Sequence, residues 1–344
     1  MSAFRTLATR TSPAGRLPGG ALIGLFGLGL SALMVPALAA TLHVAPSGSG
    51  DYTTIQAALD AAPPGSTIEL ADGVFRGPGN RDLDLRGKSL TLRSTSGDPA
   101  RCVIDCGGTP AEPHRAFDFH GQETSDCLIA DLTITGGFAG GSRAGGGAVR
   151  CTGGARPTFS QVIFTANRAA ARTTGGGAVY CSGDAAPTFI DCAFLQGEAP
   201  YGAGLYCWRS AATLIGCRFE GNAAAIHGGG LYIGNGSPTV SGCTFTANRA
   251  CGQGSRGGGI YVIDGRPVLL SCHFRANAAR HGRDCSVQAA HPTLLDCAFQ
   301  TQCPAGTPAA AEREAIHVQA GSCAVAHCAF TADSGGTRAA VLHR

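Results

Sequence analysis

Residues 228–248, GGGLYIGNGSPTVSGCTFTAN, join a glycine run to two short apolar segments. A glycine run before apolar residues occurs in phosphate-binding loops, but it also occurs at the corners of repeated strands. The glycine half of this stretch recurs as GGGAVRC at 145–151, GGGAVYC at 175–181, GAGLYC at 202–207 and GGGIYV at 257–262. The recurrence favours corners in a repeating fold over a phosphate loop.

The second half of the stretch recurs as segments that end in phenylalanine, at Phe164, Phe194, Phe219, Phe245, Phe274, Phe299 and Phe330. Neighbouring phenylalanines in this series are 25 to 31 residues apart. Such a period, with strand and turn patterns and no helical pattern, is typical of a β-solenoid. Further strands are expected at 89–94, 102–106, 116–121 and 127–137. The sequence therefore predicts an all-β parallel solenoid of about nine or ten coils.

Alternation within each strand predicts which side chains fill the interior. In LLSCHF, residues 269–274, the side chains of Leu270, Cys272 and Phe274 are expected on one face. The same spacing predicts that Ile190, Cys192, Phe194, Leu295, Cys297 and Phe299 face inward. Stacked coils would then form a phenylalanine column and, beside it, a column of Val162, Cys192, Cys217, Cys243, Cys272, Cys297 and Cys328.

Asparagine follows the phenylalanine by three residues in several coils, at Asn167, Asn222, Asn248 and Asn277. Asparagine in a turn bonds to backbone groups and tolerates left-handed backbone angles. We therefore expect an asparagine ladder at one corner of the coil, with the glycine runs at another.

The paired motifs, GGA followed by Ile, Leu or Val and FxxN, resemble the repeats of chlamydial polymorphic outer-membrane proteins. Here the pairs are GGGAVRC with FTAN, GGGLYI with FTAN and GGGIYV with FRAN, and GAGLY with FEGN is a close variant. The resemblance covers about residues 140–280. It implies a right-handed parallel β-helix and a surface or adhesive role.

The segment before the repeats has a different pattern. Ile55, Ala58, Leu59 and Ala62 follow helical spacing after two threonines that can cap a helix. Such a helix would cover the open end of the solenoid. Residues 41–75 also look like the start of pectinesterases and other pectin-lyase-like β-helix proteins. We expect a cap segment at 40–65 and the β-helix at 66–344.

The first 39 residues have the order of a secretory signal peptide. Arg5, Arg10 and Arg16 precede an uncharged apolar run at 21–35, and a small-x-small cleavage site ends at Ala39. No later segment is apolar enough for a membrane-spanning helix. The sequence therefore predicts a protein that is secreted or held at the cell-envelope surface, with no transmembrane segment after signal cleavage.

The composition gives no reason to expect nucleic acid, metals or cofactors as partners. A net charge of +3 and only 14% charged residues give no electrostatic reason to expect nucleic acid. The 16 cysteines include no CxxC motif, so neither a zinc site nor any other metal or cofactor is expected. We expect mostly free, buried thiols. Any disulfides would join turn cysteines, such as Cys251 with Cys285 and Cys303 with Cys323.

The fold class includes many polysaccharide-active enzymes, but their motifs are missing here. Pectinesterase QD and GxxDFIFG segments, polygalacturonase NTD, DD and GHG segments and the pectate lyase RxPxxR region have no counterpart. The weak catalytic candidates are Asp118 and His120 in AFDFHG, where a carboxylate would orient a histidine as general base. The alternative is an ordinary solvated strand face.

A second group of residues lies between the inward residues of the glycine-led strands: Arg150, Tyr180, Tyr206, Tyr232 and Tyr261, with Trp208 beside them. On one outer face they form a stripe that sugar rings or an aromatic-rich partner can use. Alternatively, the tyrosines only stabilise neighbouring strands by cross-strand packing.

The main expectation is a non-catalytic β-helix that binds a glycan or cell-surface partner. One alternative is a polysaccharide lyase, hydrolase or esterase of the pectin-lyase type, and another is a structural spacer in an envelope or matrix. The sequence does not indicate an oligomeric state.

Overall fold

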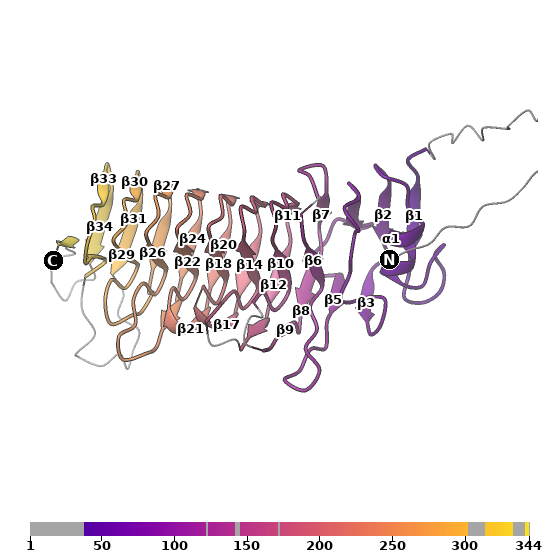
Figure 1. Ribbon diagram of the computed structural model, residues 1–344, viewed down its shortest axis with the longest axis horizontal. Helices are drawn as coiled ribbons and strands as arrows, with labels where there is room; N and C mark the ends of the chain where they lie inside the picture. Colours follow the sequence, from indigo (N-terminus) through magenta and orange to yellow (C-terminus); the bar gives the residue numbers. More distant parts are fainter. Residues whose placement is uncertain are drawn as a thin grey trace, which may run out of the picture. The chain divides into compact units, whose positions relative to one another are not determined.

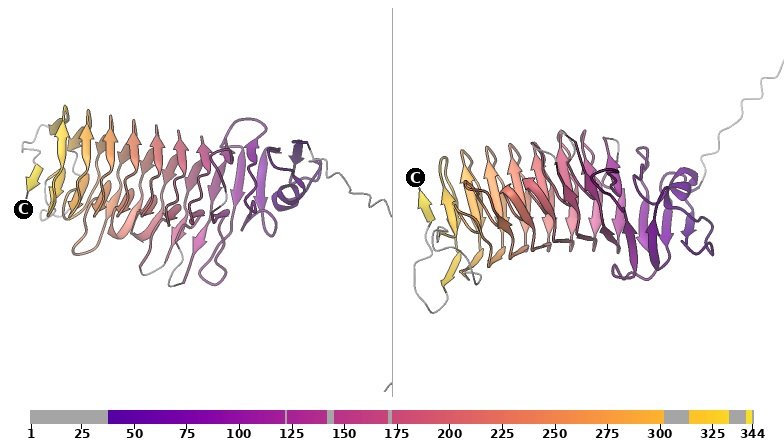
Figure 2. Two further views of the ribbon diagram at one scale, coloured as in Figure 1. Left: turned by 45° about the horizontal axis from the view of Figure 1, so that its top comes forward. Right: turned by 90° about the horizontal axis from the view of Figure 1, so that it is seen from below.

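The computed structural model describes residues 38–121, 123–141, 145–170, 173–301, 314–332 and 341–343. The predicted signal peptide therefore lies almost wholly outside the described residues. Cys303, predicted to pair with Cys323, lies outside them as well. The unit that begins at Leu38 is built from parallel strands and one helix, with the strands of successive coils side by side (Figure 1). This is the predicted β-solenoid, and it has about nine turns. Figure 2 shows the same stacking from two other directions.

Within the described residues the strands form four parallel sheets. Sheet A consists of β1 (Thr41–Val44), β2 (Thr67–Leu70), β4 (Thr91–Ser94), β7 (Leu128–Ala130), β11 (Thr158–Ser160), β15 (Thr188–Ile190), β19 (Thr213–Ile215), β23 (Thr239–Ser241), β27 (Val268–Leu270), β30 (Thr293–Leu295) and β33 (Ala324–Ala326). Sheet B consists of β3 (Gly73–Arg76), β5 (Cys102–Asp105), β8 (Thr133–Thr135), β12 (Ile163–Thr165), β16 (Ala193–Leu195), β20 (Arg218–Glu220), β24 (Thr244–Thr246), β28 (His273–Arg275), β31 (Ala298–Thr301) and β34 (Ala329–Ala332).

The other two sheets complete the coil. Sheet C consists of β6 (Phe117–Phe119), β10 (Val149–Cys151), β14 (Val179–Ser182), β18 (Leu205–Trp208), β22 (Leu231–Gly234), β26 (Ile260–Ile263), β29 (Cys285–Gln288), β32 (Ile316–Val318) and β35 (Val341–His343). Sheet D is shorter and consists of β9 (Phe138–Ala139), β13 (Arg168–Ala169), β17 (Glu198–Tyr201), β21 (Ala223–His227) and β25 (Arg249–Ala250). In a full coil the chain passes through sheets A, B, D and C in that order.

The phenylalanine column is confirmed. Phe164, Phe194, Phe219, Phe245, Phe274, Phe299 and Phe330 pair in register from coil to coil in sheet B. Neighbouring rings stack with centroids 4.5 to 5.0 Å apart. The spacing of the coils and the spacing of the rings agree, so phenylalanine can occupy this position in seven consecutive coils.

One part of the predicted interior is wrong. Leu270, Ile190 and Leu295 are only half-buried, and the residues before them, Leu269, Phe189 and Leu294, fill the core instead. The reason is a left-handed residue between the strands of sheets A and B, such as Ser271 with φ 51°. A left-handed residue turns the chain, so the alternation of one strand does not continue into the next.

The asparagine ladder is confirmed, and its bonds cross between coils. The Nδ2 group of Asn248 donates to the Phe219 carbonyl at 2.9 Å and to Asn277 Oδ1 at 3.1 Å. Asn222 donates in the same way to Phe194 and to Asn248. The left-handed position is not the asparagine, as expected from the sequence, but the residue before it, such as Ala247 with φ 53°.

The predicted N-terminal helix is α1, Ile55–Ala61, which buries Ile55, Ala58 and Leu59. It packs against β1 and β2 at the first turn of the solenoid (Figure 1). The threonine side chains do not cap it. The Ile55 N–H donates to Asn80 Oδ1 at 3.0 Å instead. The sequence pattern also missed β1, which precedes the helix and pairs with β2.

The fifteen cysteines in the described residues are all free thiols. Cys192, Cys217, Cys243, Cys272 and Cys297 are buried in one column, and Cys328 continues it half-buried. Cys251 is exposed, but Cys285 is not a turn residue, because it lies in β29 with its side chain in the core. The proposed pair of Cys251 with Cys285 is therefore wrong, because Cys251 is exposed whereas Cys285 is buried in the core.

No helix in the described residues is long and apolar enough to cross a membrane.

Phe245→Ala should lower the free energy of unfolding by about 3 kcal/mol or more, because it removes a fully buried ring and leaves a cavity. Urea unfolding followed by circular dichroism measures the change. Ile215→Ala, on the exposed face of β19, is the matched control and should have little effect. Equal midpoints for Phe245→Ala and the parent chain would contradict the inward register.

Asp284 lies at the end of the asparagine ladder and should make the stability of the fold depend on pH. It is almost fully buried and accepts a hydrogen bond from Asn277 Nδ2 at 2.9 Å. Burial raises the pKa of Asp284 from 3.8 to about 6, against the opposing effects of Asn277 and Arg283. The folded state thus holds this proton more tightly than the unfolded state, so stability falls as pH rises from about 4 to about 6.

Asp284→Asn keeps the acceptor for Asn277 but cannot ionise. We expect the variant to be more stable than the parent at about pH 7.5, by up to about 3 kcal/mol, and to lose this advantage near pH 4. Thermal melts across the pH range measure it, with the exposed Asp264→Asn as control. A stability difference independent of pH would contradict the assignment.

Candidate functional site

The outward residues of sheet C form one column along the solenoid, here called the floor. The register aligns Asp118, Arg150, Tyr180, Tyr206, Tyr232, Tyr261, Ser286 and His317. The Tyr206 and Tyr232 rings stack with centroids 4.6 Å apart, and the Tyr180 and Tyr206 rings stack at 5.3 Å. The residues of the stripe expected from the sequence are therefore brought together by the coil stacking.

The middle of the floor is less open than a surface stripe would be. Tyr206, Tyr232 and Tyr261 are only 6%, 7% and 2% exposed. The Tyr206 ring is stacked between the rings of Tyr180 and Tyr232, so a sugar cannot stack on its faces. The Tyr261 ring packs against Tyr232 and His227. The Tyr261 hydroxyl donates to Gln288 Oε1 at 2.6 Å. The expectation of an exposed tyrosine stripe is thus wrong for these three residues, and cross-strand packing explains their rings.

A second column, here called the wall, explains the burial of Tyr232 and Tyr261. It consists of Tyr201, His227, Arg256 and His281, which are bridged to one another from coil to coil. Each precedes a glycine of positive φ, as His227 precedes Gly228 with φ 66°. The wall rings lean onto the floor of the next coil, with Tyr201 5.7 Å from Tyr232 and His227 4.7 Å from Tyr261 between ring centroids.

The opposite side of the floor is formed by the last residues of the sheet C strands. Trp208, Gly234, Ile263 and Gln288 align there. The Trp208 ring lies on Gly234, where an added Cβ would collide with it. Trp208 is only half-buried and is the single tryptophan of the chain. It therefore forms a rigid aromatic edge held in place by the glycine of the next coil.

Floor, wall and edge enclose a groove of about 570 Å³. It is lined by Thr173, Thr174, Tyr180, Tyr201, Tyr206, Trp208, His227, Tyr232, Tyr261, Ile263 and Gln288. Sequence reasoning missed Tyr201 and His227. The sequence feature that could have identified them is an aromatic residue directly before a glycine, as at Tyr201, His227 and His281.

The lining carries no carboxylate among the described residues and is neutral near pH 7. Burial, assisted by the charge of Arg256, lowers the pKa of His227 from 6.5 to about 4. Burial raises the pKa of Tyr261 to about 12 and also raises the pKa of Tyr206 and Tyr232. The groove thus offers hydroxyl, amide and neutral imidazole groups beside aromatic rings.

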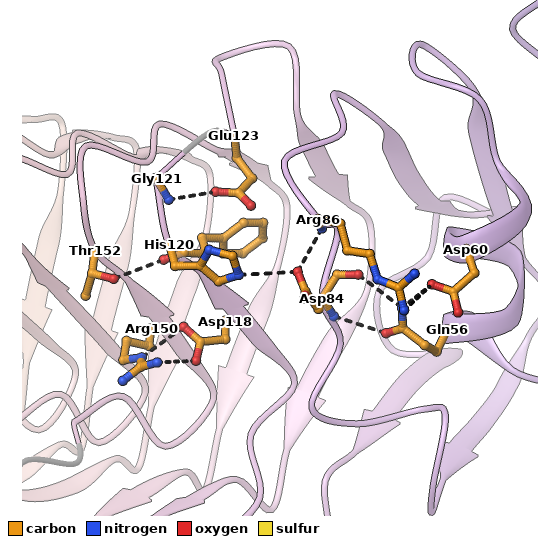
Figure 3. Close-up of polar contacts among 11 residues, drawn as sticks. Gln56, Asp60, Asp84, Arg86, Asp118, His120, Gly121, Glu123, Arg150 and Thr152 are labelled. Atoms are coloured by element: carbon orange, nitrogen blue, oxygen red, sulfur yellow. Dashed lines mark hydrogen bonds and ion pairs between the residues drawn. The ribbon is translucent and has the colours of Figure 1, made fainter. Parts of the chain in front are cut away.

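The weak catalytic candidates lie at the N-terminal end of the floor (Figure 3). Arg150 donates to both carboxylate oxygens of Asp118, from Nε to Oδ1 at 2.9 Å and from Nη2 to Oδ2. His120 Nε2 faces Asp84 Oδ1 at 3.4 Å instead. The expectation that Asp118 orients His120 is therefore wrong, because cross-strand pairing gives Asp118 to Arg150. That pairing also engages Arg150, which the sequence had suggested as a ligand-binding residue.

The family model described as right handed beta helix region matches residues 119–299 and 203–334, together more than half of the chain. The chain belongs to this right-handed β-helix family. No protein among the curated proteins compared with it matches.

Three solved structures resemble this β-helix. Pectate lyase Pel9A is 13% identical, with 88% of this chain and 79% of that chain covered and a TM-score of 0.44. Pectin methylesterase from carrot is 15% identical, with 86% and 88% covered and a TM-score of 0.38. Alginate lyase from Paenibacillus sp. strain FPU-7 is 14% identical, with 89% and 98% covered and a TM-score of 0.38. We draw no functional conclusion from similarities this weak.

Gly234→Ala should displace the Trp208 ring and so open that edge of the groove, because no space exists for the added Cβ. We expect tryptophan emission to shift to the red and acrylamide quenching to increase. Gly254→Ala is the control, since a Cβ there meets nothing within 4 Å. Unchanged emission in Gly234→Ala would show that Trp208 does not rest on this glycine.

Proposed function

We propose that this protein is a secreted or surface-held β-helix that binds a glycan chain in the groove without cleaving it. The observation that carries the proposal is the groove itself, a neutral channel with aromatic rings on both sides of a row of tyrosine hydroxyls. Sugars combine apolar C–H faces with hydroxyl groups, and such a lining complements both.

Three half-buried rings supply the contact surfaces: Tyr180, Tyr201 and Trp208. The buried tyrosines of the floor, Tyr206, Tyr232 and Tyr261, present only edges and hydroxyls. These lining residues repeat at the coil spacing of roughly 4.8 Å along the axis. A periodic groove suits an extended polymer better than a compact small molecule.

The chemistry of the lining favours binding over cleavage. Glycosidases use a pair of carboxyl groups at the scissile bond, and the described lining has none. Asp118, the carboxylate at the end of the floor, is held by Arg150. An extracellular setting is supported by the signal-peptide pattern and by the resemblance of the paired repeats to those of chlamydial polymorphic outer-membrane proteins.

One observation favours a second candidate, a lyase acting on acidic polysaccharides. His227 is neutral above about pH 5 and lies beside Arg256, whose charge can hold a uronate carboxylate while a tyrosine hydroxyl supplies a proton. A base with a pKa of about 4 is weak, so we place this candidate second.

Binding can be followed through the Trp208 emission. The mature chain is titrated with neutral and acidic oligosaccharides selected on a glycan array, and we expect a saturable change in emission. Tyr201→Ala should weaken the affinity about tenfold, the loss of one aromatic contact. Ile215→Ala, exposed on sheet A, should bind like the parent.

The same incubations distinguish the alternatives. Unsaturated products or new reducing ends would replace the binding proposal with the lyase candidate or a hydrolase. An affinity of Tyr201→Ala equal to that of the parent chain would show that the glycan binds outside the groove. The absence of binding to any glycan would favour the structural spacer.

A further inference from the structure

We propose that His281, Glu314 and His317 form a binding site for one divalent transition-metal ion, with Zn²⁺ as the best match. The site lies beyond the C-terminal end of the tyrosine groove and does not depend on glycan binding. It revises the sequence-based expectation that the protein holds no metal.

The three side chains converge on one point. One ligand atom from each lies within 4.8 Å of the ligand atoms of the other two. His317 Nδ1 and Glu314 Oε1 are 2.6 Å apart, and the His281 and His317 rings have centroids 5.1 Å apart. Two ligands of a tetrahedral zinc ion are ~3.3 Å apart, so small side-chain rotations bring all three into range.

The repeat geometry produces this convergence. His281 is the last residue of the wall, directly before Gly282, and His317 belongs to the floor, two strands beyond Tyr261. An added Cβ at Gly282 would lie 3.0 Å from His317 Cβ, so the wall approaches the floor closely here. The pair repeats the contact of His227 with Tyr261, with histidine replacing the floor tyrosine.

The donor set selects the class of metal. Two imidazole nitrogens and one carboxylate oxygen form a set that zinc takes, with a fourth position left for water or another ligand. Ca²⁺ and Mg²⁺ prefer sites built from oxygen atoms, so two histidines disfavour them.

Burial supports a cation at this point. Glu314 is 8% exposed and His317 is 3% exposed, so both ligand groups are largely withdrawn from water, where a bound cation interacts strongly with a carboxylate.

The cysteine spacing, on which the sequence-based metal prediction rested, gives no indication of this cluster of histidines and a glutamate. Glu314 and His317 are three residues apart, but His281 lies 33 residues before Glu314, one coil earlier. Only the stacking of coils brings the first histidine to the other two.

The test uses Co²⁺ as a spectroscopic substitute for Zn²⁺ on the chelator-treated mature chain. We expect one Co²⁺ per chain, visible d–d bands and no thiolate-to-cobalt charge-transfer band, and we expect Zn²⁺ to displace the Co²⁺. The missing sulfur band separates this site from the cysteines. Exposed Cys251 is blocked by alkylation beforehand.

Variants locate the ion. His281→Ala and His317→Gln should each weaken affinity more than ~100-fold, beyond the ~10–100-fold that loss of an outer hydrogen-bond partner costs. Glu314→Gln should do the same, and a ~10–100-fold loss would instead make Glu314 the partner that orients His317. His291→Ala, an exposed histidine bonded to Ser322, is the matched control.

Circular dichroism checks that each variant is folded. His281→Ala should disturb folding least of the three variants, because His281 is only half-buried. The proposal fails if the parent chain binds no Co²⁺, if the bound ion shows the sulfur band, or if folded His281→Ala binds as tightly as His291→Ala.

Discussion

The structure depends on one constraint, the parallel register by which each coil rests on equivalent residues of the coil before it. Backbone hydrogen bonds fix this register strand by strand, and the side chains then have to be compatible with copies of themselves. Phe219 and Phe245 satisfy this with rings 4.7 Å apart, close to the roughly 4.8 Å spacing of paired strands. Asn222 and Asn248 satisfy it with a hydrogen bond of 2.8 Å between their side chains.

The same register organises the outer face. Tyr206 stacks beneath Tyr232 for the reason that Phe219 stacks beneath Phe245, although one pair faces out and the other in. A column on the surface becomes a groove only because a second column leans over it. Residues of the wall and floor can therefore differ from coil to coil, as at His317, without disturbing the core that holds the coils together.

The interior was largely predictable from the sequence, because phenylalanine, cysteine and asparagine recur at matching positions. The failures arise where backbone conformation intervenes. Leu270 was placed inward because alternation was carried across Ser271, whose left-handed conformation turns the chain. Tyr206, Tyr232 and Tyr261 were expected to be exposed because the prediction used only the alternation within the sheet C strands. The wall residues that pack against Tyr232 and Tyr261 lie outside those strands, so this alternation does not show them. Asp118 was assigned to His120 because two strand neighbours were considered without Arg150 from the next coil.

The central claim is that the stacked coils bury Tyr206, Tyr232 and Tyr261, whereas Tyr180, Tyr201 and Trp208 remain partly accessible. Hydroxyl-radical footprinting of the folded protein, resolved residue by residue by mass spectrometry, measures this directly. The account predicts strong protection of Tyr206, Tyr232 and Tyr261. It predicts faster oxidation of Tyr180, Tyr201 and Trp208. Equal oxidation of all the tyrosines, or protection of Tyr201 with exposure of Tyr232, would contradict it.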